Sequence, residues 1–413
     1  MNPVNVEPLK EGWRWMRLGE VCISTENRDP RTTPDLLFRY VDISGVDNRL
    51  KRIIKTHTIL WNDAPSRARQ IIKANDVLVA TTRPNLNAVA LVPEELNNEI
   101  CSTGICVLRP TEVINSLFLF FFVQSKYFID TISGSGQVRG MLYPAVTDKQ
   151  VRNVYIPLPP LHEQNRIAAK LQELMEEVER ARTACEKKLE AAKALPAAYL
   201  REVFESEEAK KWERKRLGEV CEYNSGVWGD EPDSSSLCYP VLRSNNIHNG
   251  KIVFDEVAIR KINARYIETK KLKAGDILVT TSSGSRDLLG KSALFVQPSD
   301  GKTYLFSNFT MRLCPKNKII DSIFLYFYLQ SPEAKETLKL LQDTTTGLRN
   351  MDRKEFLNQM IPFPTLATQQ LIAAELKEKM AQVEKLRTTI EKQLETINAL
   401  PQAVLRKAFR GEL

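Results

Sequence analysis

The sequence predicts an α+β protein with two globular domains and two long helices that pair as an antiparallel coiled coil. Three observations support this prediction. The chain contains an internal repeat, each copy begins with short apolar runs broken by turn residues, and each copy ends in a long stretch of helical periodicity. The repeat divides the 413 residues into a first globular domain at 1–157, a central helical region at 158–205, a second globular domain at 206–362 and a C-terminal helical region at 363–413.

The internal repeat consists of short segments that return in the same order. The segment WRWMRLGEVC at 13–22 returns as WERKRLGEVC at 212–221, and the offset between matched segments drifts only from 199 to 206. The other matched pairs are 73–79 with 273–279, 116–125 with 322–331, 156–159 with 361–364, and 194–196 with 399–401. Kept order and spacing indicate a duplicated structural unit.

The first part of each copy has the composition of a globular domain. It is rich in β-branched and aromatic runs interrupted by Gly, Pro, Asn and Asp, and the segments 76–81 and 276–281 are predicted to be buried strands. Trp13 and Trp212 occupy the same setting in both copies, so we expect them in a core or a docking contact rather than stacked on a base.

The second part of each copy follows a proline-rich stop and is predicted to be one long helix. The apolar positions step by 4, 4, 3, 3, 4, 4 and 3 residues in both copies, which keeps them on one helix face. They are Ile167, Leu171, Met175, Val178, Ala181, Cys185, Leu189 and Ala192 in the first copy, and Ile372, Leu376, Met380, Val383, Leu386, Ile390, Leu394 and Ile397 in the second.

Two burial modes are open to such a helix. Each helix could lie on its own globular domain, but two matched narrow stripes favour an antiparallel pair. A pseudo-two-fold axis would then relate the copies, with the globular domains held apart at opposite ends of a rod.

Composition excludes several classes of protein. The net charge of +8 attracts polyanions, although charge alone is weak evidence for nucleic-acid binding. Seven cysteines without a C-x-x-C pair and only three histidines argue against a disulfide framework and a metal site, and they fit a reducing cytoplasm. The chain shows no signal segment, and its longest strongly apolar run, 117–123, is too short for a membrane helix.

Specific motifs resemble those of the specificity subunit of type I restriction-modification enzymes. The carrying segments are LPPLHEQNRIA at 158–168, AVLRKAFRGEL at 403–413, the domain opening at 212–221, and YPVLRSNNI at 239–247. The resemblance covers essentially the whole chain. It implies two target recognition domains that each read half of a bipartite, asymmetric site in double-stranded DNA. It also implies that the helices act as spacer and scaffold for two methyltransferase subunits and for motor-nuclease subunits.

The two helix starts differ in sequence. The second helix opens LATQQLI at 366–372 and lacks the Glu-Gln and Arg of the first, which argues against an equal role of the two starts in docking.

No catalytic motif of the implied system is present in the sequence. A methyltransferase would need a cofactor pocket and an Asn/Asp-Pro-Pro-aromatic tetrapeptide, and neither copy contains that tetrapeptide. The segment 285–292 resembles a phosphate-binding loop, but Ser285 replaces its first glycine, so we interpret the segment as a loop between strands. The sequence therefore predicts a non-catalytic subunit without a cofactor or metal. A stand-alone enzyme and a purely structural scaffold are the alternatives.

Candidate DNA-reading side chains lie on loops after predicted strands. Arg pairs with guanine and Asn with adenine at base edges, and loops vary freely on a fixed scaffold. The candidates are Arg83, Asn85, Asn87 and Arg139 in the first domain, and Arg243, Asn245, Asn246, Arg286 and Arg349 in the second. Any of them could instead be solvated or cap a turn, and Arg139 and Arg349, which match across the repeat, could belong to the scaffold.

Overall fold

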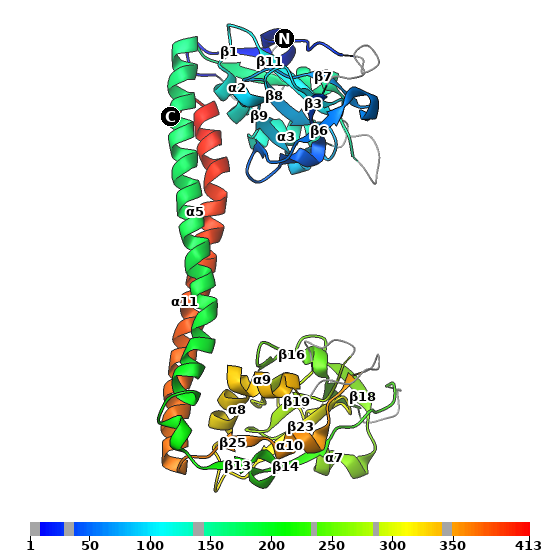
Figure 1. Cartoon of the computed structure of the whole chain (residues 1–413), viewed down its shortest axis with the longest axis vertical. Helices are drawn as coiled ribbons and strands as arrows, with labels where there is room; N and C mark the ends of the chain where they lie inside the picture. The colour runs from blue at the N-terminus through cyan, green and yellow to red at the C-terminus, as the bar shows by residue number, and fades with distance from the viewer. Residues whose placement is uncertain (1–8, 29–36, 135–143, 233–237, 284–288, 341–348) are drawn as a thin grey trace. The chain divides into compact units, whose positions relative to one another are not determined.

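The computed structural model describes residues 9–28, 37–134, 144–232, 238–283, 289–340 and 349–413. Its contacts divide the chain into two compact units (Figure 1). The first is Met1–Glu186 with Lys392–Leu413, and the second is Lys187–Glu391. Each unit therefore contains one globular domain, the start of one long helix and the end of the other. The α+β class with two globular domains and two long helices is confirmed.

The globular domain of the first unit alternates short strands with helical turns. Its elements are β1 (Arg14–Arg17), α1 (Leu18–Val21), β2 (Cys22–Ile23), β3 (Leu37–Val41), η2 (Ile43–Gly45), β4 (Val46–Asp47), β5 (Arg52–Ile53), β6 (His57–Leu60), η3 (Trp61–Asp63), β7 (Ala68–Ile71), β8 (Val77–Ala80), η4 (Pro84–Leu86), β9 (Val89–Leu91), η5 (Glu94–Leu96), β10 (Ile100–Ser102), β11 (Ile105–Pro110), α2 (Ser116–Phe122), α3 (Lys126–Ser133), α4 (Asp148–Arg152) and β12 (Tyr155–Leu158).

The globular domain of the second unit repeats this plan. Its elements are η6 (Ala209–Lys211), β13 (Arg214–Arg216), α6 (Leu217–Val220), β14 (Cys221–Ser225), β15 (Cys238–Leu242), η7 (Ser244–Asn246), β16 (Ile247–His248), β17 (Lys251–Ile252), β18 (Ala258–Lys261), α7 (Ala264–Lys270), β19 (Ile277–Thr280), β20 (Ser282–Ser283), β21 (Ser292–Leu294), β22 (Leu305–Phe306), β23 (Thr310–Pro315), α8 (Ser322–Gln330), α9 (Pro332–Leu340), β24 (Arg349–Asn350), α10 (Arg353–Asn358) and β25 (Met360–Pro362).

The two larger sheets of the first domain have counterparts in the second, one of them with three strands instead of four among the described residues. The four-stranded sheet β2-β11-β8-β9 of the first domain corresponds to β14-β23-β19-β21 of the second. The sheet β6-β3-β10-β7 corresponds to β18-β15-β22, and each contains one parallel pair, β3 with β10 and β15 with β22. The duplication seen in the sequence is therefore a duplication of topology.

The central strands confirm the predicted buried segments. All four residues of β8 and all four of β19 are buried, as continuous apolar runs require. Trp13 is only 8% exposed and its indole Nε1 donates to Glu163 Oε2 at 3.1 Å, whereas Trp212 is half-buried against Phe324. Both tryptophans thus have the core or docking role predicted for them.

Each predicted long helix is a single uninterrupted helix in the structure. α5 spans Leu161–Phe204 and α11 spans Leu366–Phe409, 44 residues each. The apolar stripe of each helix is buried or half-buried, except that Ala181 and Leu386 are exposed. Lys, Glu, Arg and Gln side chains, most of them exposed, occupy many of the remaining positions.

The two helices run antiparallel within each unit. In the first unit, Ile167 and Leu171 near the start of α5 share a core with Leu405 and Ala408 near the end of α11. In the second unit, Leu200 and Phe204 at the end of α5 share a core with Ala373 and Leu376 near the start of α11. The predicted antiparallel pairing is therefore present in both units.

A phenylalanine at the end of each helix anchors it to a globular domain. In the first unit Phe409 packs edge-on against Phe118 and Phe122 of α2, with ring centroids 5.2 and 5.4 Å apart. In the second unit Phe204 packs in the same way against Phe324 and Tyr328 of α8, at 5.5 and 5.4 Å.

These anchors give a matched pair of stability predictions. Phe204→Ala is expected to destabilise the second unit by about 3–5 kcal/mol because Phe204 is fully buried. Phe409→Ala is expected to destabilise the first unit by less because Phe409 is half-buried. Hydrogen exchange resolved by segment measures both effects: each variant should speed exchange in the aromatic helix that it contacts, α8 or α2. Equal acceleration in both helices by either variant would contradict the assignment.

A buried glutamine fixes the start of each long helix to its globular domain. Gln164 Oε1 accepts from Asn115 N at 2.9 Å, and its Nε2 donates to the carbonyls of Val113 and Pro159 at 3.0 and 2.9 Å. In the second unit, the side chain of Gln369 repeats this arrangement. Its Oε1 accepts from Asp321 N at 2.8 Å, and its Nε2 donates to the carbonyls of Ile319 and Pro364 at 3.3 and 2.9 Å.

The paired glutamines correct one point of the sequence comparison. Gln369 lies five residues after Pro364, as Gln164 lies five residues after Pro159, so the second helix start does keep the glutamine of the first. Two residues do differ: the counterpart of Arg166 is Leu371, and the counterpart of Glu163, which binds Lys10 Nζ at 2.9 Å and Trp13, is Thr368. The hydrogen bond from Lys10 lowers the pKa of the Glu163 carboxyl below its usual range.

Candidate nucleic-acid interface

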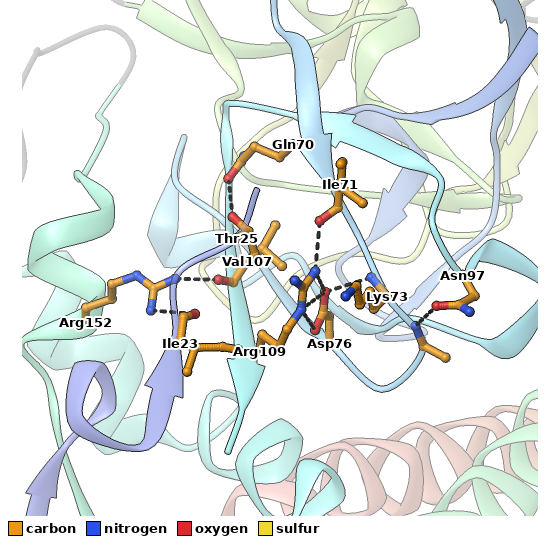
Figure 2. A network of polar contacts seen from close by, with 11 residues as sticks. Ile23, Thr25, Gln70, Ile71, Lys73, Asp76, Asn97, Val107, Arg109 and Arg152 are labelled. Atoms are coloured by element: carbon orange, nitrogen blue, oxygen red, sulfur yellow. Dashed lines mark hydrogen bonds and ion pairs between the residues drawn. The ribbon is translucent and has the colours of Figure 1, made fainter. Parts of the chain in front are cut away.

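A buried ion pair anchors the strand that leads into the first candidate loop. Asp76, just before β8, is 1% exposed and accepts hydrogen bonds from Arg109 Nε at 3.0 Å and Nη2 at 2.9 Å (Figure 2). Asp76 also accepts from Lys73 N at 2.8 Å, and Arg109 donates to the carbonyl of Ile71 at 3.0 Å. The pair thus fixes the turn before β8 to strand β11.

The second domain keeps the carboxylate and places its cation differently. Asp276 accepts from Lys273 N at 2.7 Å as Asp76 does from Lys73 N. Its ion-pair partner is Arg312, at 3.7 Å, which stands two residues before the counterpart of Arg109 on the matching strand. Burial raises the pKa of the Asp276 carboxyl, and the Lys273 N–H and Arg312 partly offset this.

Backbone hydrogen bonds bring the two candidate segments of the first domain together. Thr81 N donates to Gly104 O at 3.0 Å, Val146 N donates to Thr81 O at 2.9 Å, and Arg83 N donates to Pro144 O at 2.7 Å. The loop after β8 therefore lies beside the end of the segment that carries Arg139. Arg139 itself lies outside the described residues.

The loop after β8 offers two of its three candidate side chains to solvent. Arg83 and Asn85 are exposed, and Arg83 has a left-handed backbone with φ 51°. Asn87 is only 5% exposed; its Nδ2 donates to the Val123 carbonyl at 2.8 Å, and its Oδ1 accepts from Lys51 Nζ at 2.8 Å. Burial lowers the pKa of Lys51 to about 8. Asn87 thus supports the loop from inside and is not proposed as a DNA contact.

Four segments meet at the matching edge of the second domain. Thr281 N donates to Phe309 O, and Met351 N donates to Thr281 O, both at 2.9 Å. Ser307 N donates to Leu242 O at 2.8 Å, and the short strands β20 and β24 pair with each other. The loop that begins at residue 243 and the segments 281–283, 307–309 and 349–351 therefore share one edge.

The candidates of the second domain divide as those of the first do. Asn245 is exposed, whereas Asn246 is 2% exposed and is used internally: its Oδ1 accepts from Arg243 N at 3.0 Å and its Nδ2 donates to Val253 O at 3.1 Å. Arg243 is half-buried, and its Nε has no hydrogen-bond partner among the described residues. Arg286 lies outside the described residues, as does the side chain of Arg349, whose backbone forms part of β24.

A polar hollow of about 610 Å³ opens at this edge of the second domain. It is lined by Thr281, Ser282, Asn308, Phe309, Asn350, Met351, Asp352, Arg353 and Lys354. The sequence reasoning missed Asn308, Asn350 and both cations because none of them follows directly on a predicted buried strand. The available signal was the repeat itself, since β24 begins at Arg349, the counterpart of Arg139, and α10 follows it.

A second hollow, of about 950 Å³, lies in the first unit, where α3 meets the end of α11. Its lining includes Trp15, Tyr127, Phe409, Lys126 and Arg406, so it combines aromatic and cationic groups. The residues that match Trp15 and Tyr127 in the second unit are Arg214 and Glu333, which form an ion pair at 2.7 Å. The helix ends of the two units therefore present different chemistry.

The described residues contain no helix that is long and apolar enough to cross a membrane, and no group of three or more His, Cys, Asp or Glu side chains that could hold a metal ion. Ser292, the last residue of the segment that resembles a phosphate-binding loop, is buried at the start of strand β21, and its Oγ accepts from Gln330 Nε2 at 2.8 Å. A phosphate-binding loop would place this serine at a helix start. Residues 285–288 of the segment lie outside the described residues.

Comparison with known proteins agrees with the doubled architecture. A family model described as "Type I restriction modification DNA specificity domain" matches residues 10–187 and again 209–396. The chain is 26% identical over 360 residues to the type I restriction enzyme EcoKI specificity subunit of Escherichia coli (strain K12), covering 83% of this chain and 76% of that protein. It is 25% identical over 367 residues to the MjaVIII specificity subunit of Methanocaldococcus jannaschii, covering 83% of this chain and 80% of that protein.

Two solved structures are similar over nearly the full length. The HsdS subunit from Thermoanaerobacter tengcongensis is 34% identical, with a TM-score of 0.67 over 98% of this chain and 99% of that one. A chain from work on "complex assembly and conformational transition of the type I R-M system" is also 34% identical, with a TM-score of 0.82 over 99% of this chain and 100% of that one.

Proposed function

The chain belongs to the type I restriction-modification DNA specificity family, and on that premise we propose that its two globular domains each read one half of a bipartite site in double-stranded DNA. As a member of this family, the chain is the non-catalytic, sequence-specific DNA-recognition subunit of a type I system. The single observation that best supports the bipartite proposal is the repeated edge: the same strands end in the same place in both domains, but the loops there carry different side chains.

We assign base reading to the exposed side chains at these edges. In the first domain these are Arg83 and Asn85, and in the second Asn245, to which we add the half-buried Arg243. An arginine fork matches the two acceptors of guanine, and an asparagine amide matches the donor and acceptor of adenine. Arg139, Arg286 and Arg349 stay predictions as DNA contacts.

The long helices are proposed as a spacer and as the scaffold for the other subunits of the system. Four leucines on them are exposed, namely Leu161, Leu371, Leu386 and Leu400, at 40–69%. We propose that these side chains contribute to the surface on which the other subunits dock. We propose two methyltransferase subunits and the motor-nuclease subunits as the occupants. None of the seven cysteines forms a disulfide, which fits assembly in the reducing cytoplasm.

Matched substitutions in the two domains test the assignment. Asn85→Ala should relax one base pair of one half-site, and Asn245→Ala one base pair of the other, each at a cost of about 1–3 kcal/mol in discrimination. Methylome sequencing of the host reads both half-sites at once. Replacing residues 1–157 by those of a homologue should change the first half-site alone. A change in both half-sites from any one of these alterations would refute one domain per half-site.

A further inference from the structure

An exposed tryptophan stands at the DNA-reading edge of the second domain. Trp228 is 65% exposed, and its only described aromatic neighbour is Phe309, which is itself 38% exposed. The two rings are perpendicular, with centroids 5.6 Å apart and an angle of 88° between their planes. In an edge-to-face pair the edge of one ring covers at most one face of the other, and with these exposures a large apolar surface is left open.

The turn that carries Trp228 is built to hold it outward. A Cβ on Gly226 would come within 2.2 Å of the Phe306 and Ser307 carbonyl oxygens, and Gly229 has φ 76° and would meet Ile262. Between these glycines, Val227 is buried and its N–H donates to the Phe306 carbonyl at 2.9 Å. The backbone is therefore tightly held on both sides of Trp228.

The surroundings of the aromatic pair fit a polyanion with planar bases. Phe309 also lines the 610 Å³ hollow, which offers the amides of Asn308 and Asn350 and the cations of Arg353 and Lys354. Thr281 is 2% exposed, lines the same hollow, and its Oγ1 has no hydrogen-bond partner among the described residues. The one carboxylate in the lining, Asp352, accepts from the backbone of Lys354 at the start of α10.

The first domain lacks Phe309 at the matching place. Gly104 occupies that position, since Thr81 N donates to Gly104 O as Thr281 N donates to Phe309 O. In the first domain Thr81 Oγ1 is satisfied by the Gly104 carbonyl at 2.9 Å, and the Ile43 side chain lies where a Cβ on Gly104 would point. A feature required by the shared scaffold would be present in both domains, so the aromatic pair is specific to what the second domain binds.

We infer that Trp228 and Phe309 form an aromatic wedge that packs against a base step of the half-site read by the second domain. This inference rests on the proposed function and adds a specificity-determining contact to it. The amides of Asn308 and Asn350 line the hollow beside the wedge and can bind base edges. The cations of Arg353 and Lys354 line the same hollow and can bind phosphates. Apolar wedges and aromatic stacking are general means by which proteins grip bases without a hydrogen bond.

The test uses the chain assembled with its methylating subunits and a duplex carrying the site found by methylome sequencing. Trp228→Ala should weaken binding to that duplex roughly tenfold to a hundredfold. It should leave binding to a duplex with a scrambled second half-site unchanged. Trp228→Phe should retain affinity within a few-fold. The control is Tyr223→Ala, which removes another exposed aromatic ring of the same domain that does not line the hollow.

Two further readouts separate the wedge from other roles. Arg353→Ala and Lys354→Ala should each reduce the dependence of log affinity on log salt, whereas Trp228→Ala should not, because no phosphate contact is lost. Unchanged affinity in Trp228→Ala would overturn the inference. A second outcome would also overturn it: Trp228→Ala releases the methylating subunits, while the assemblies that stay intact bind DNA with normal affinity. Trp228 would then be a contact to protein and not to DNA.

The inference and the proposed function fail in different ways. If the wild-type complex bound the full and scrambled duplexes equally, sequence reading by two domains would be refuted. If Trp228→Ala then weakened binding of the complex to both duplexes, the wedge would still be supported as a DNA contact. If binding to neither duplex weakened, the wedge would be refuted.

Discussion

Replacing Arg109 with methionine is expected to destabilise the first recognition domain by about 3–5 kcal/mol and to leave the second domain unchanged. The substitution removes every guanidinium hydrogen bond from Asp76, which is 1% exposed and then has only the Lys73 N–H as a described side-chain partner (Figure 2). A buried carboxylate without its cation bears the full cost of desolvation. DNA reading by the second domain should survive, since its own pair, Asp276 with Arg312, is separate.

A double-mutant cycle separates the lost pair from lost packing. Asp76→Asn keeps an acceptor for Lys73 N but carries no charge, so the Arg109→Met/Asp76→Asn double variant should be more stable than the sum of the single effects implies. Urea unfolding followed by hydrogen exchange in β8 and β19 measures each domain separately. Additive single effects would show that Arg109 stabilises the domain by packing rather than through Asp76.

Lengthening the paired helices by four residues each is expected to lengthen the unread spacer of the DNA site by one base pair. The insertions belong after Arg182 in α5 and before Asn398 in α11, because Arg182 Nε donates to Asn398 Oδ1 at 2.9 Å, so the two points face each other. Four residues add about 6 Å and about 40° of rotation. One base pair of B-DNA adds about 3.4 Å and about 35°. The added rotation therefore matches one base pair. We expect one added base pair because a recognition domain tolerates a shift of a few ångströms along the DNA better than a large rotation away from the DNA groove that it reads.

Two-residue insertions at the same points are the control for this prediction. They turn each helix by about 200° and should abolish sequence-specific methylation. Methylome sequencing should find both half-site sequences unchanged in the four-residue variant. An active four-residue variant with its original spacer would show that the partner subunits, and not the helices, set the distance between half-sites.

The features that depend on local periodicity were predictable from the sequence. The strands β8 and β19 are continuous apolar runs, and the stripe on each long helix repeats at helical spacing, so both could be identified without a structure. The duplication made the prediction of fold class specific. Exposed Ala181 and Leu386 show where the regular pattern continues without burial.

The candidate site was only partly predictable, because a polar side chain on a loop can face outward or inward. Asn87 and Asn246 belong to the same loops as exposed Asn85 and Asn245, yet both are buried and satisfy backbone groups. Sequence spacing contains no signal for this difference, since it depends on which carbonyls the fold brings near. The partner of Asp276 was hidden for the same reason: Arg312 is not at the position that matches Arg109.

The glutamine at the start of each long helix has a consequence for how recognition domains can be replaced. Apart from its own helix, Gln164 bonds to one N–H and two carbonyls, and Gln369 does the same, so each glutamine binds main-chain atoms alone. Main-chain atoms are common to every sequence. A foreign domain with the same loop before its aromatic helix would therefore offer this glutamine the same partners whatever its side chains. Chimeras cut after Pro159 or Pro364 should seat correctly as long as the acceptor helix keeps its glutamine.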